Sequence, residues 1–226
     1  MEENKLITVN DIKKDAKLSK LIHQANKMLE AIGYTEHGPR HVGFVSVTAR
    51  KVLEELGYPE RMCELAAIAG WVHDVGNSIN RMNHGITGGI MLFPLLQEAG
   101  MDLDEVLTIV GAVGNHEEQN GKVVSAVSAA LVIADKSDAH RTRVRKNIYD
   151  PGDIHDRVNY SIRENKVEVD AQERVIRFTL TMDESASVMD FLSIYLSRMQ
   201  MCEDAATYLG CRFEMVVNGL IINRAQ

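Results

Sequence analysis

Residues 71–77 read WVHDVGN and place a histidine beside an aspartate at the end of an apolar segment. Apolar residues in that segment recur every three or four positions, which predicts a helix with one buried face. Gly76 is typical of a residue that follows a helix end. Three interpretations of His73 and Asp74 compete: a buried pair satisfied by hydrogen bonds, a surface pair, or two ligands of one metal site. The apolar residues are Met62, Leu65, Ala66, Ala69 and Val72.

The same helical period continues on both sides of this stretch, from about residue 17 to residue 148. In VTARKVLEELGYP we expect Val47 and Val52 on the buried face, Gly57 as the helix stop and Pro59 as the next start. The segment 123–147 is expected to form the longest helix. No strand–helix alternation is visible, so residues 1–150 are predicted to be a mainly α helical bundle.

The composition changes after residue 148. YDPGDIHD at 149–156 reads as a break, and KVEVDAQERVIRFTLTMD at 166–183 alternates in twos around a polar turn, as hairpins do. A helix is predicted from about Ser187 to Leu209, and a second hairpin around Asn218-Gly219. Residues 151–226 are therefore expected to be a small α+β unit. One face of its helix is expected to pack on the hairpins, with a homodimer contact or a lid as alternatives: Met189, Leu192, Leu196, Met199 and Ala206.

Bulk properties exclude several classes of protein. The chain has 226 residues, 45% of them hydrophobic and 25% charged, which is ordinary for a globular protein. Its net charge of −7 argues against a binder of nucleic-acid polymers. The longest uncharged runs are too short to span a bilayer, and the N-terminus does not read as a signal peptide. Cys63, Cys202 and Cys211 lack CxxC spacing, so we expect reduced thiols in a cytoplasmic protein.

Six side chains that can bind metal lie at core-facing ends of successive predicted helices. Each histidine taken alone is more often a core residue than a ligand. Two buried carboxylates, however, need compensating charge, and imidazoles with carboxylates around divalent cations provide it. The second His-Asp pair, His155-Asp156, follows a break and reads as surface or domain junction, and His23 and His37 lie off the apolar stripes. The six residues are His41, His73, Asp74, His84, His116 and Asp135.

In this ordered set the sequence resembles the HD superfamily of metal-dependent phosphohydrolases, over roughly residues 37–146. The resemblance implies an all-α bundle with a binuclear site holding two divalent transition-metal ions, from Fe, Mn, Co, Ni or Zn. Asp74 would bridge the two ions, and His84 and His116 would complete the second. The ligands it implies for the first ion are His41, His73, Asp74 and Asp135.

Basic residues beside Asp135 are either substrate contacts or a solvated helix face on which Asp138 pairs with Arg141. Lys136 follows Asp135 directly, and ADKSDAHR resembles the segment in which dinucleoside-tetraphosphate hydrolases place an arginine, here Arg141. On a continuous helix, Arg143 and Lys146 would point closer to Asp135 than Arg141 does. The Lys or Arg usual after HD-x-G is replaced by Asn77, a departure from the family pattern.

The resemblance implies hydrolysis of a phosphate ester or anhydride in a nucleotide or small phosphorylated metabolite, with Asp74 as the catalytic residue. Two other functions remain open. Diiron oxygenases carry the same ligand order on this scaffold, and a non-catalytic nucleotide sensor is a third interpretation. Glu117, next to His116, is either exposed or orients a ligand.

Overall fold

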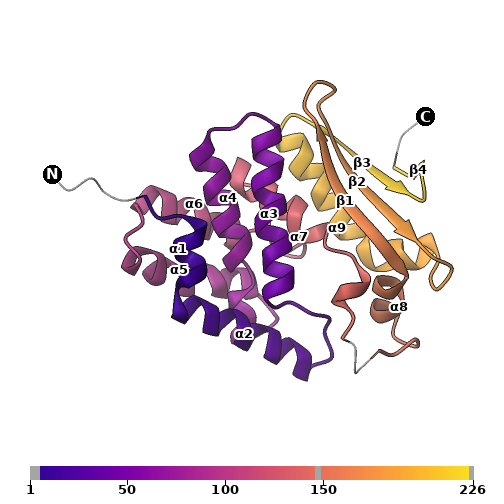
Figure 1. The fold of residues 1–226 in the computed structure, drawn as a ribbon, viewed down its shortest axis with the longest axis horizontal. Helices are drawn as coiled ribbons and strands as arrows, with labels where there is room; N and C mark the ends of the chain where they lie inside the picture. Colours follow the sequence, from indigo (N-terminus) through magenta and orange to yellow (C-terminus); the bar gives the residue numbers. More distant parts are fainter. Residues whose placement is uncertain (1–5, 146–148, 224–226) are drawn as a thin grey trace.

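The computed structural model describes residues 6–145 and 149–223, and Lys146 lies outside them. The helices formed by residues 9–136 occupy one side of the molecule, and the C-terminal sheet lies on the other side with the later helices (Figure 1). The mainly α bundle followed by an α+β unit is thus confirmed. The helices of the bundle are α1 (Val9–Lys14), α2 (Ala16–Ala31), α3 (Pro39–Glu55), α4 (Glu60–Val72), α5 (His84–Glu98), α6 (Leu103–Gly114) and α7 (Ala126–Lys136), with the short 3-10 turns η1 (Val75–Ser78) and η2 (Arg141–Arg143).

Two glycines let the elements around WVHDVGN approach closely. A side chain at Gly70 would come within 2.8 Å of the Ser46 backbone, so α4 lies directly against α3. A side chain at Gly76 would overlap the carbonyl of His84, so η1 lies against the first turn of α5. Gly76 therefore does more than end a helix, because its small size brings His84 next to Asp74.

The prediction of one long helix over 123–147 was wrong. α7 ends at Lys136, and Ser137 donates a hydrogen bond from Oγ to the carbonyl of Ala134 at 2.9 Å. Beyond it, Arg143 donates to the carbonyl of Asp138 at 3.0 Å and so stabilises a turned chain. Side-chain bonding to the backbone competes with helix continuation, and the direction of the basic residues after Asp135 changes as a result.

One predicted core position of α3 was also wrong, because Val47 is 63% exposed. The buried stripe of α3 runs through His41, Val45, Thr48 and Val52. This stripe follows the helical period from His41, and it carries that histidine into the interior.

The C-terminal unit contains both predicted hairpins in one sheet. Its elements are α8 (Ile154–Ser161), β1 (Ile162–Asp170), β2 (Val175–Met182), α9 (Val188–Tyr208), β3 (Arg212–Val217) and β4 (Leu220–Ile221). The strand order is β1-β2-β3-β4; β2 and β3 are parallel and α9 connects them. Asn218 and Gly219 have φ values of 48° and 83°, which is the conformation that a tight Asn-Gly hairpin requires.

The buried face of α9 differs from the predicted one. Met189 is 73% exposed and Leu196 is 54% exposed. Helix α9 packs between α7 and the sheet (Figure 1), so two of its sides are covered by different partners. A single stripe cannot describe such a helix. Its buried residues are Phe191, Tyr195, Met199, Met201, Cys202, Ala205 and Ala206.

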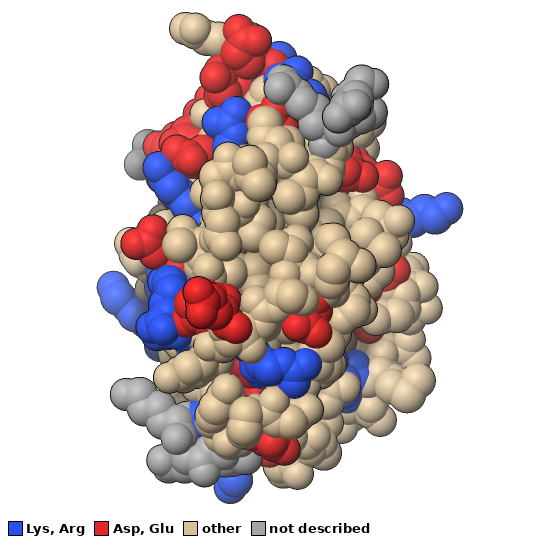
Figure 2. Space-filling model, turned by 90° about the vertical axis from the view of Figure 1, so that its right-hand side faces the viewer, with Lys and Arg blue, Asp and Glu red and all other residues tan. Residues whose placement is uncertain are grey.

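The two parts of the chain share one hydrophobic core, to which buried residues from α3 to β3 contribute. Figure 2 views the side on which the C-terminal sheet lies and shows a broad uncharged area between groups of charged side chains. The three cysteines are buried and free. Within the described ranges, no helix combines the length and the apolar character needed to cross a bilayer.

Candidate metal centre

The six predicted ligands lie together in the interior of the bundle. His41 lies in the first turn of α3, His73 caps α4, and Asp74 precedes η1. His84 begins α5, and Asp135 lies in the last turn of α7. Three overlapping groups each bring their ligand atoms within 4.8 Å of one another: His41, His73 and Asp74; His73, His116 and Asp135; and Asp74, His84 and His116.

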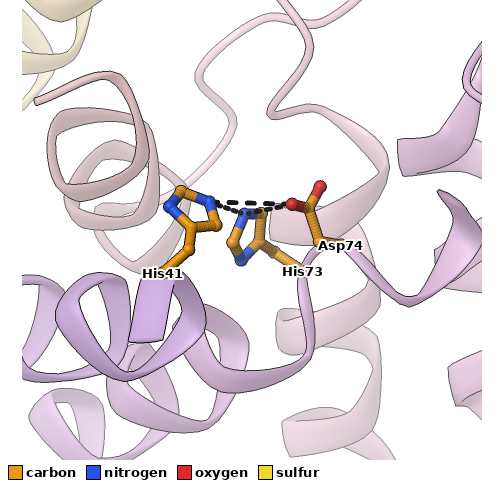
Figure 3. Close-up of side chains that lie close together, drawn as sticks. All are labelled: His41, His73 and Asp74. Carbon is orange, nitrogen blue, oxygen red and sulfur yellow. Dashed lines mark hydrogen bonds and ion pairs between the residues drawn. The ribbon is translucent and has the colours of Figure 1, made fainter. Parts of the chain in front are cut away.

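The first group surrounds the Nε2 atoms of His41 and His73, which are 3.3 Å apart. His41 Nε2 lies 3.6 Å from Asp74 Oδ2 and 3.4 Å from Asp135 Oδ1. His73 Nε2 lies 3.6 Å and 3.5 Å from the same two oxygens. Figure 3 shows His41, His73 and Asp74 pointing toward one another.

The group of Asp74, His84 and His116 surrounds the Nε2 atoms of His84 and His116, which are 3.0 Å apart. His84 Nε2 lies 3.2 Å from Asp74 Oδ1, and Arg81 Nη1 lies 3.3 Å from the same nitrogen. The two oxygens of Asp74 therefore face different histidines, Oδ2 facing His41 and His73 and Oδ1 facing His84. Asp74 lies at the centre of the cluster.

The tautomer of each histidine follows from the partner of its Nδ1 atom. These atoms lie beside acceptors: Asp138 Oδ2 for His41 at 2.6 Å, the Gly70 carbonyl for His73 at 2.9 Å, the Arg81 carbonyl for His84 at 3.1 Å and the Val113 carbonyl for His116 at 2.6 Å. In a neutral ring, the nitrogen facing an acceptor carries the proton and the other presents a lone pair. All four Nε2 lone pairs then face the cluster, which is the arrangement of metal-binding histidines.

This donor set fits divalent transition metals. With neutral rings, the Nε2 lone pairs that lie 3.0 and 3.3 Å apart repel one another, and Asp74 Oδ2 is buried without a hydrogen-bond partner among the described residues. A cation coordinated by imidazole nitrogens and carboxylate oxygens removes both penalties. The buried His and Asp groups can therefore hold metal ions.

The pKa shifts of His116, Asp74 and Asp135 favour ligand-competent forms. Burial opposes protonation of His41 and His84, but the carboxylates beside them outweigh it and raise both pKa values, so metal binding would displace protons from these two rings. Burial lowers the pKa of His116 to about 3, so this imidazole is neutral at pH 7. Burial opposes ionisation of Asp74 and Asp135, but the charges around them outweigh it and lower both pKa values. For Asp74 these are the neighbouring histidines, and for Asp135 the Lys136 ammonium and two histidines. Neutral imidazoles and ionised carboxylates are the forms that bind metal.

Two carboxylates outside the six candidate ligands lie beside the Nδ1 atoms of His41 and His84 and orient these rings. Asp138 Oδ2 accepts a hydrogen bond from His41 Nδ1, and its carboxylate also pairs with Arg40 and Arg143. Glu117 Oε1 lies 3.1 Å from His84 Nδ1 and accepts from the Gly85 amide, so it orients this ligand and is not exposed. Sequence reasoning missed Asp138 as the partner of His41. Its position three residues after a helical ligand was the available signal, but the break of α7 obscures it.

A cleft of about 760 Å³ opens over the cluster. Lys136 lines it, and its Nζ lies 2.8 Å from Asp135 Oδ2 and 2.9 Å from Glu118 Oε2. Arg143 also lines it and donates to His37 Nε2 at 2.8 Å. His37 is thus a cleft residue, although it lies off the predicted apolar stripes. His155 lines the rim, while Asp156 accepts from the Asp150 amide outside the cluster.

Arg141 is not brought to this cleft. Its guanidinium lies over the Tyr160 ring, donates to the Tyr160 carbonyl at 2.5 Å and lies 3.5 Å from Asp183. The turn after α7 rotates Arg141 toward α8 and Arg143 toward the ligands. Arg143 therefore takes the place beside the site that the resemblance implied for Arg141.

Comparisons with known proteins give one structural similarity to report. A scan against protein-family models finds no match, and a search of curated proteins finds no relative. The crystal structure of a predicted HD superfamily hydrolase from an uncultured Thermotogales bacterium is similar, with a TM-score of 0.44 and 20% identity. The similarity covers 55% of this chain and 67% of that one. A structural similarity this low does not assign a function, so any functional proposal depends on the geometry of the site.

Metal binding is expected to stabilise the protein strongly. Adding Mn²⁺, Fe²⁺ or Zn²⁺ to chelator-treated protein, at a free concentration about 100 times the dissociation constant, contributes roughly 2.7 kcal/mol. For a chain of this length, the midpoint of thermal unfolding rises by roughly 5–10 °C. Differential scanning fluorimetry measures the shift. Mg²⁺, which prefers oxygen ligands, is the control and should give a smaller shift. A shift with Mg²⁺ equal to the shifts with Mn²⁺, Fe²⁺ and Zn²⁺ would contradict a transition-metal centre.

Proposed function

We propose that the protein is a metal-dependent phosphohydrolase whose two divalent transition-metal ions share Asp74. The observation that carries this proposal is that the two oxygens of the Asp74 carboxylate face different histidines. Its Oδ2 faces His41 and His73, whereas its Oδ1 faces His84. A carboxylate that bridges two ions is the arrangement used in two-metal hydrolysis.

Divalent ions in this site would activate a water molecule as nucleophile and polarise the phosphoryl group. Basic side chains of the protein would stabilise the negative charge of the reacting phosphoryl group. Burial opposes protonation of Lys136, but the carboxylates of Asp135 and Glu118 outweigh this effect. The net pKa of Lys136 is raised, so the amine stays protonated. Lys136 and Arg143 then neutralise charge that develops on the phosphoryl oxygens.

The cleft suits a phosphorylated small molecule better than a polymer. Its volume of about 760 Å³ lies in the range of small-ligand sites. Beyond the metal cluster its wall includes an aromatic ring, Tyr34, and the amides of Asn83 and Asn120. Rings and amides of this kind stack on and hydrogen-bond to nucleobases, so a nucleotide is the substrate class that we propose.

The test is a metal measurement followed by an activity panel. Elemental analysis of protein purified without chelators should find a bound transition metal. The same protein should hydrolyse p-nitrophenyl phosphate or members of a nucleotide panel, lose activity after chelation and regain it with metal. Absence of metal, or metal without turnover of any phosphate ester, would reject the hydrolase. Oxygen uptake with a mixed-valent iron signal would identify the oxygenase instead.

A further inference from the structure

The C-terminal unit forms part of the wall of the metal cleft. Asn159 from α8 and Tyr195 and Arg198 from α9 line the same cavity as Asp74 and Asp135. These residues are separated from Asp74 by more than 80 positions along the chain. The unit is therefore placed to contact whatever binds at the metal centre.

Arg198 is held in a fixed position by an aromatic support. Its guanidinium carbon lies 4.7 Å from the centre of the Tyr195 ring. Tyr195 stacks on Phe191 with ring centroids 4.4 Å apart and an interplanar angle of 5°. The Tyr195 hydroxyl also donates to Asn159 Oδ1 at 3.2 Å. An arginine on such a platform loses little conformational entropy when it binds a ligand.

Arg198 is linked electrostatically to the metal ligands. Its Nε lies 3.4 Å from Glu118 Oε1, and the other oxygen of Glu118 contacts Lys136, which contacts Asp135. The Glu118 carboxylate thus pairs with both Arg198 and Lys136. Lys136 in turn contacts Asp135, a ligand of the proposed metal.

The terminal nitrogens of Arg198 remain available. Within the described residues, Nη1 and Nη2 make no recorded hydrogen bond, and the side chain is 27% exposed. These N–H groups form the planar fork that binds carboxylates and phosphates through two parallel hydrogen bonds. A partly shielded arginine in a ligand cleft with a free fork is a preorganised anion site.

We infer that Arg198 binds a second anionic group of the substrate, beyond the phosphoryl group at the metals. This inference rests on the proposed function and deepens it. The substrate class becomes phosphorylated compounds that carry a further phosphate or carboxylate. The C-terminal unit then determines specificity within the active site. Arg198 is a substrate-binding residue, whereas Tyr195 and Asn159 position it.

The test compares ligands that differ only in the second acid. Isothermal titration calorimetry with metal-loaded protein measures binding of phosphonoacetate, 3-phosphonopropionate and 4-phosphonobutyrate, each against the alkylphosphonate of similar length. At the matching length, the carboxylate is expected to strengthen binding about 10-fold or more, as expected for a hydrogen-bonded ion pair. R198Q should bind both members of that pair equally, and R198K should show an intermediate preference.

R157Q is the matched control. Arg157 belongs to the same unit, its side chain is 30% exposed, and it forms a similarly long ion pair with Asp190 at 3.7 Å, outside the cleft lining. R157Q should keep the preference for the carboxylate ligands. No preference in the wild type at any length, or an unchanged preference in R198Q, overturns the inference.

Activity assays distinguish a failure of the Arg198 anion site from a failure of the proposed hydrolase function. With p-nitrophenyl phosphate, which lacks a second anionic group, R157Q should keep wild-type kcat/KM, and R198Q should lose less kcat/KM than it loses with a hydrolysed substrate that carries a second acid. An equal loss with every substrate would assign Arg198 a purely structural role and overturn the inference. A wild type that hydrolyses no phosphate ester rejects the hydrolase, while the calorimetric comparison still decides whether Arg198 binds an anion.

Discussion

Replacing Asp74 by alanine is expected to remove the bound metal and to abolish phosphate-ester hydrolysis. Asp74 faces His41 and His73 through Oδ2 and His84 through Oδ1, so its loss would affect both of the proposed ions. Loss of a residue that only orients a ligand typically costs about 10- to 100-fold in metal affinity. The loss of metal affinity in Asp74→Ala should therefore exceed about 100-fold. Competition with a chromogenic chelator and elemental analysis measure this loss.

The second His-Asp pair provides the control for this experiment. Asp156→Ala makes the same chemical change in IHDR, where the carboxylate accepts a hydrogen bond from the Asp150 amide and joins none of the three ligand groups. This variant should keep both metal and activity. Circular dichroism verifies that Asp74→Ala is folded. A folded Asp74→Ala protein that retains stoichiometric metal would refute the central role of Asp74.

Asp138→Ala is expected to cause the largest loss of stability. Asp138 is 1% exposed, and its carboxylate contacts His41, Arg40 and Arg143. Removing one partner of a buried ion pair leaves uncompensated charge and costs about 3–5 kcal/mol. Because Arg40 is partly exposed, we expect the free energy of unfolding to fall by about 3 kcal/mol, measured by urea denaturation. Metal affinity should fall about 10- to 100-fold, since His41 loses its orienting partner.

Asp183→Ala is the matched control for Asp138. Asp183 also pairs with two arginines, Arg141 and Arg163, but it lies nearer the surface and solvent weakens those pairs. Its removal should cost less than about 1 kcal/mol and leave metal affinity unchanged. Equal stability losses in the two variants would show that burial of Asp138 is not the deciding factor.

The dependence on pH gives a second check on Asp138. Burial opposes its ionisation, but His41, Arg143 and Arg40 outweigh it and lower its pKa in the folded protein. A lowered pKa stabilises the fold above the unfolded value of about 3.9, and this stabilisation is lost as the pH falls through the folded value. The difference in unfolding free energy between wild type and Asp138→Ala should therefore be constant near pH 7 and shrink below about pH 4.

The order of the six candidate ligands was visible in the sequence because helical periodicity is a local property. His41 shares a stripe with Val45 and Val52, and Asp135 follows the buried Leu131 at a spacing of four residues in α7. Each position follows from spacing along one helix, without knowledge of its neighbours. The Asn218-Gly219 hairpin was predictable for the same reason, since few residues adopt two successive positive φ angles.

The residues around the ligands were decided by contacts between distant segments. The end of α7 at Lys136 removed Arg141 from the site and brought Arg143 to it, a change that a wheel drawn on a continuous helix could not show. Asp138 became the partner of His41 across 97 positions. Such pairs depend on how whole elements pack, and spacing within one element does not encode them.

The sequence by itself therefore determined a helical protein with an inward-facing set of imidazoles and carboxylates, together with the two hairpins. Only the tertiary structure decided which atoms face one another, and that all four Nδ1 atoms meet acceptors while the Nε2 atoms converge. It also placed Arg198 of α9 beside Glu118 in the cleft. The physical reason is that periodicity specifies which face of an element is buried, whereas packing specifies which other element covers it.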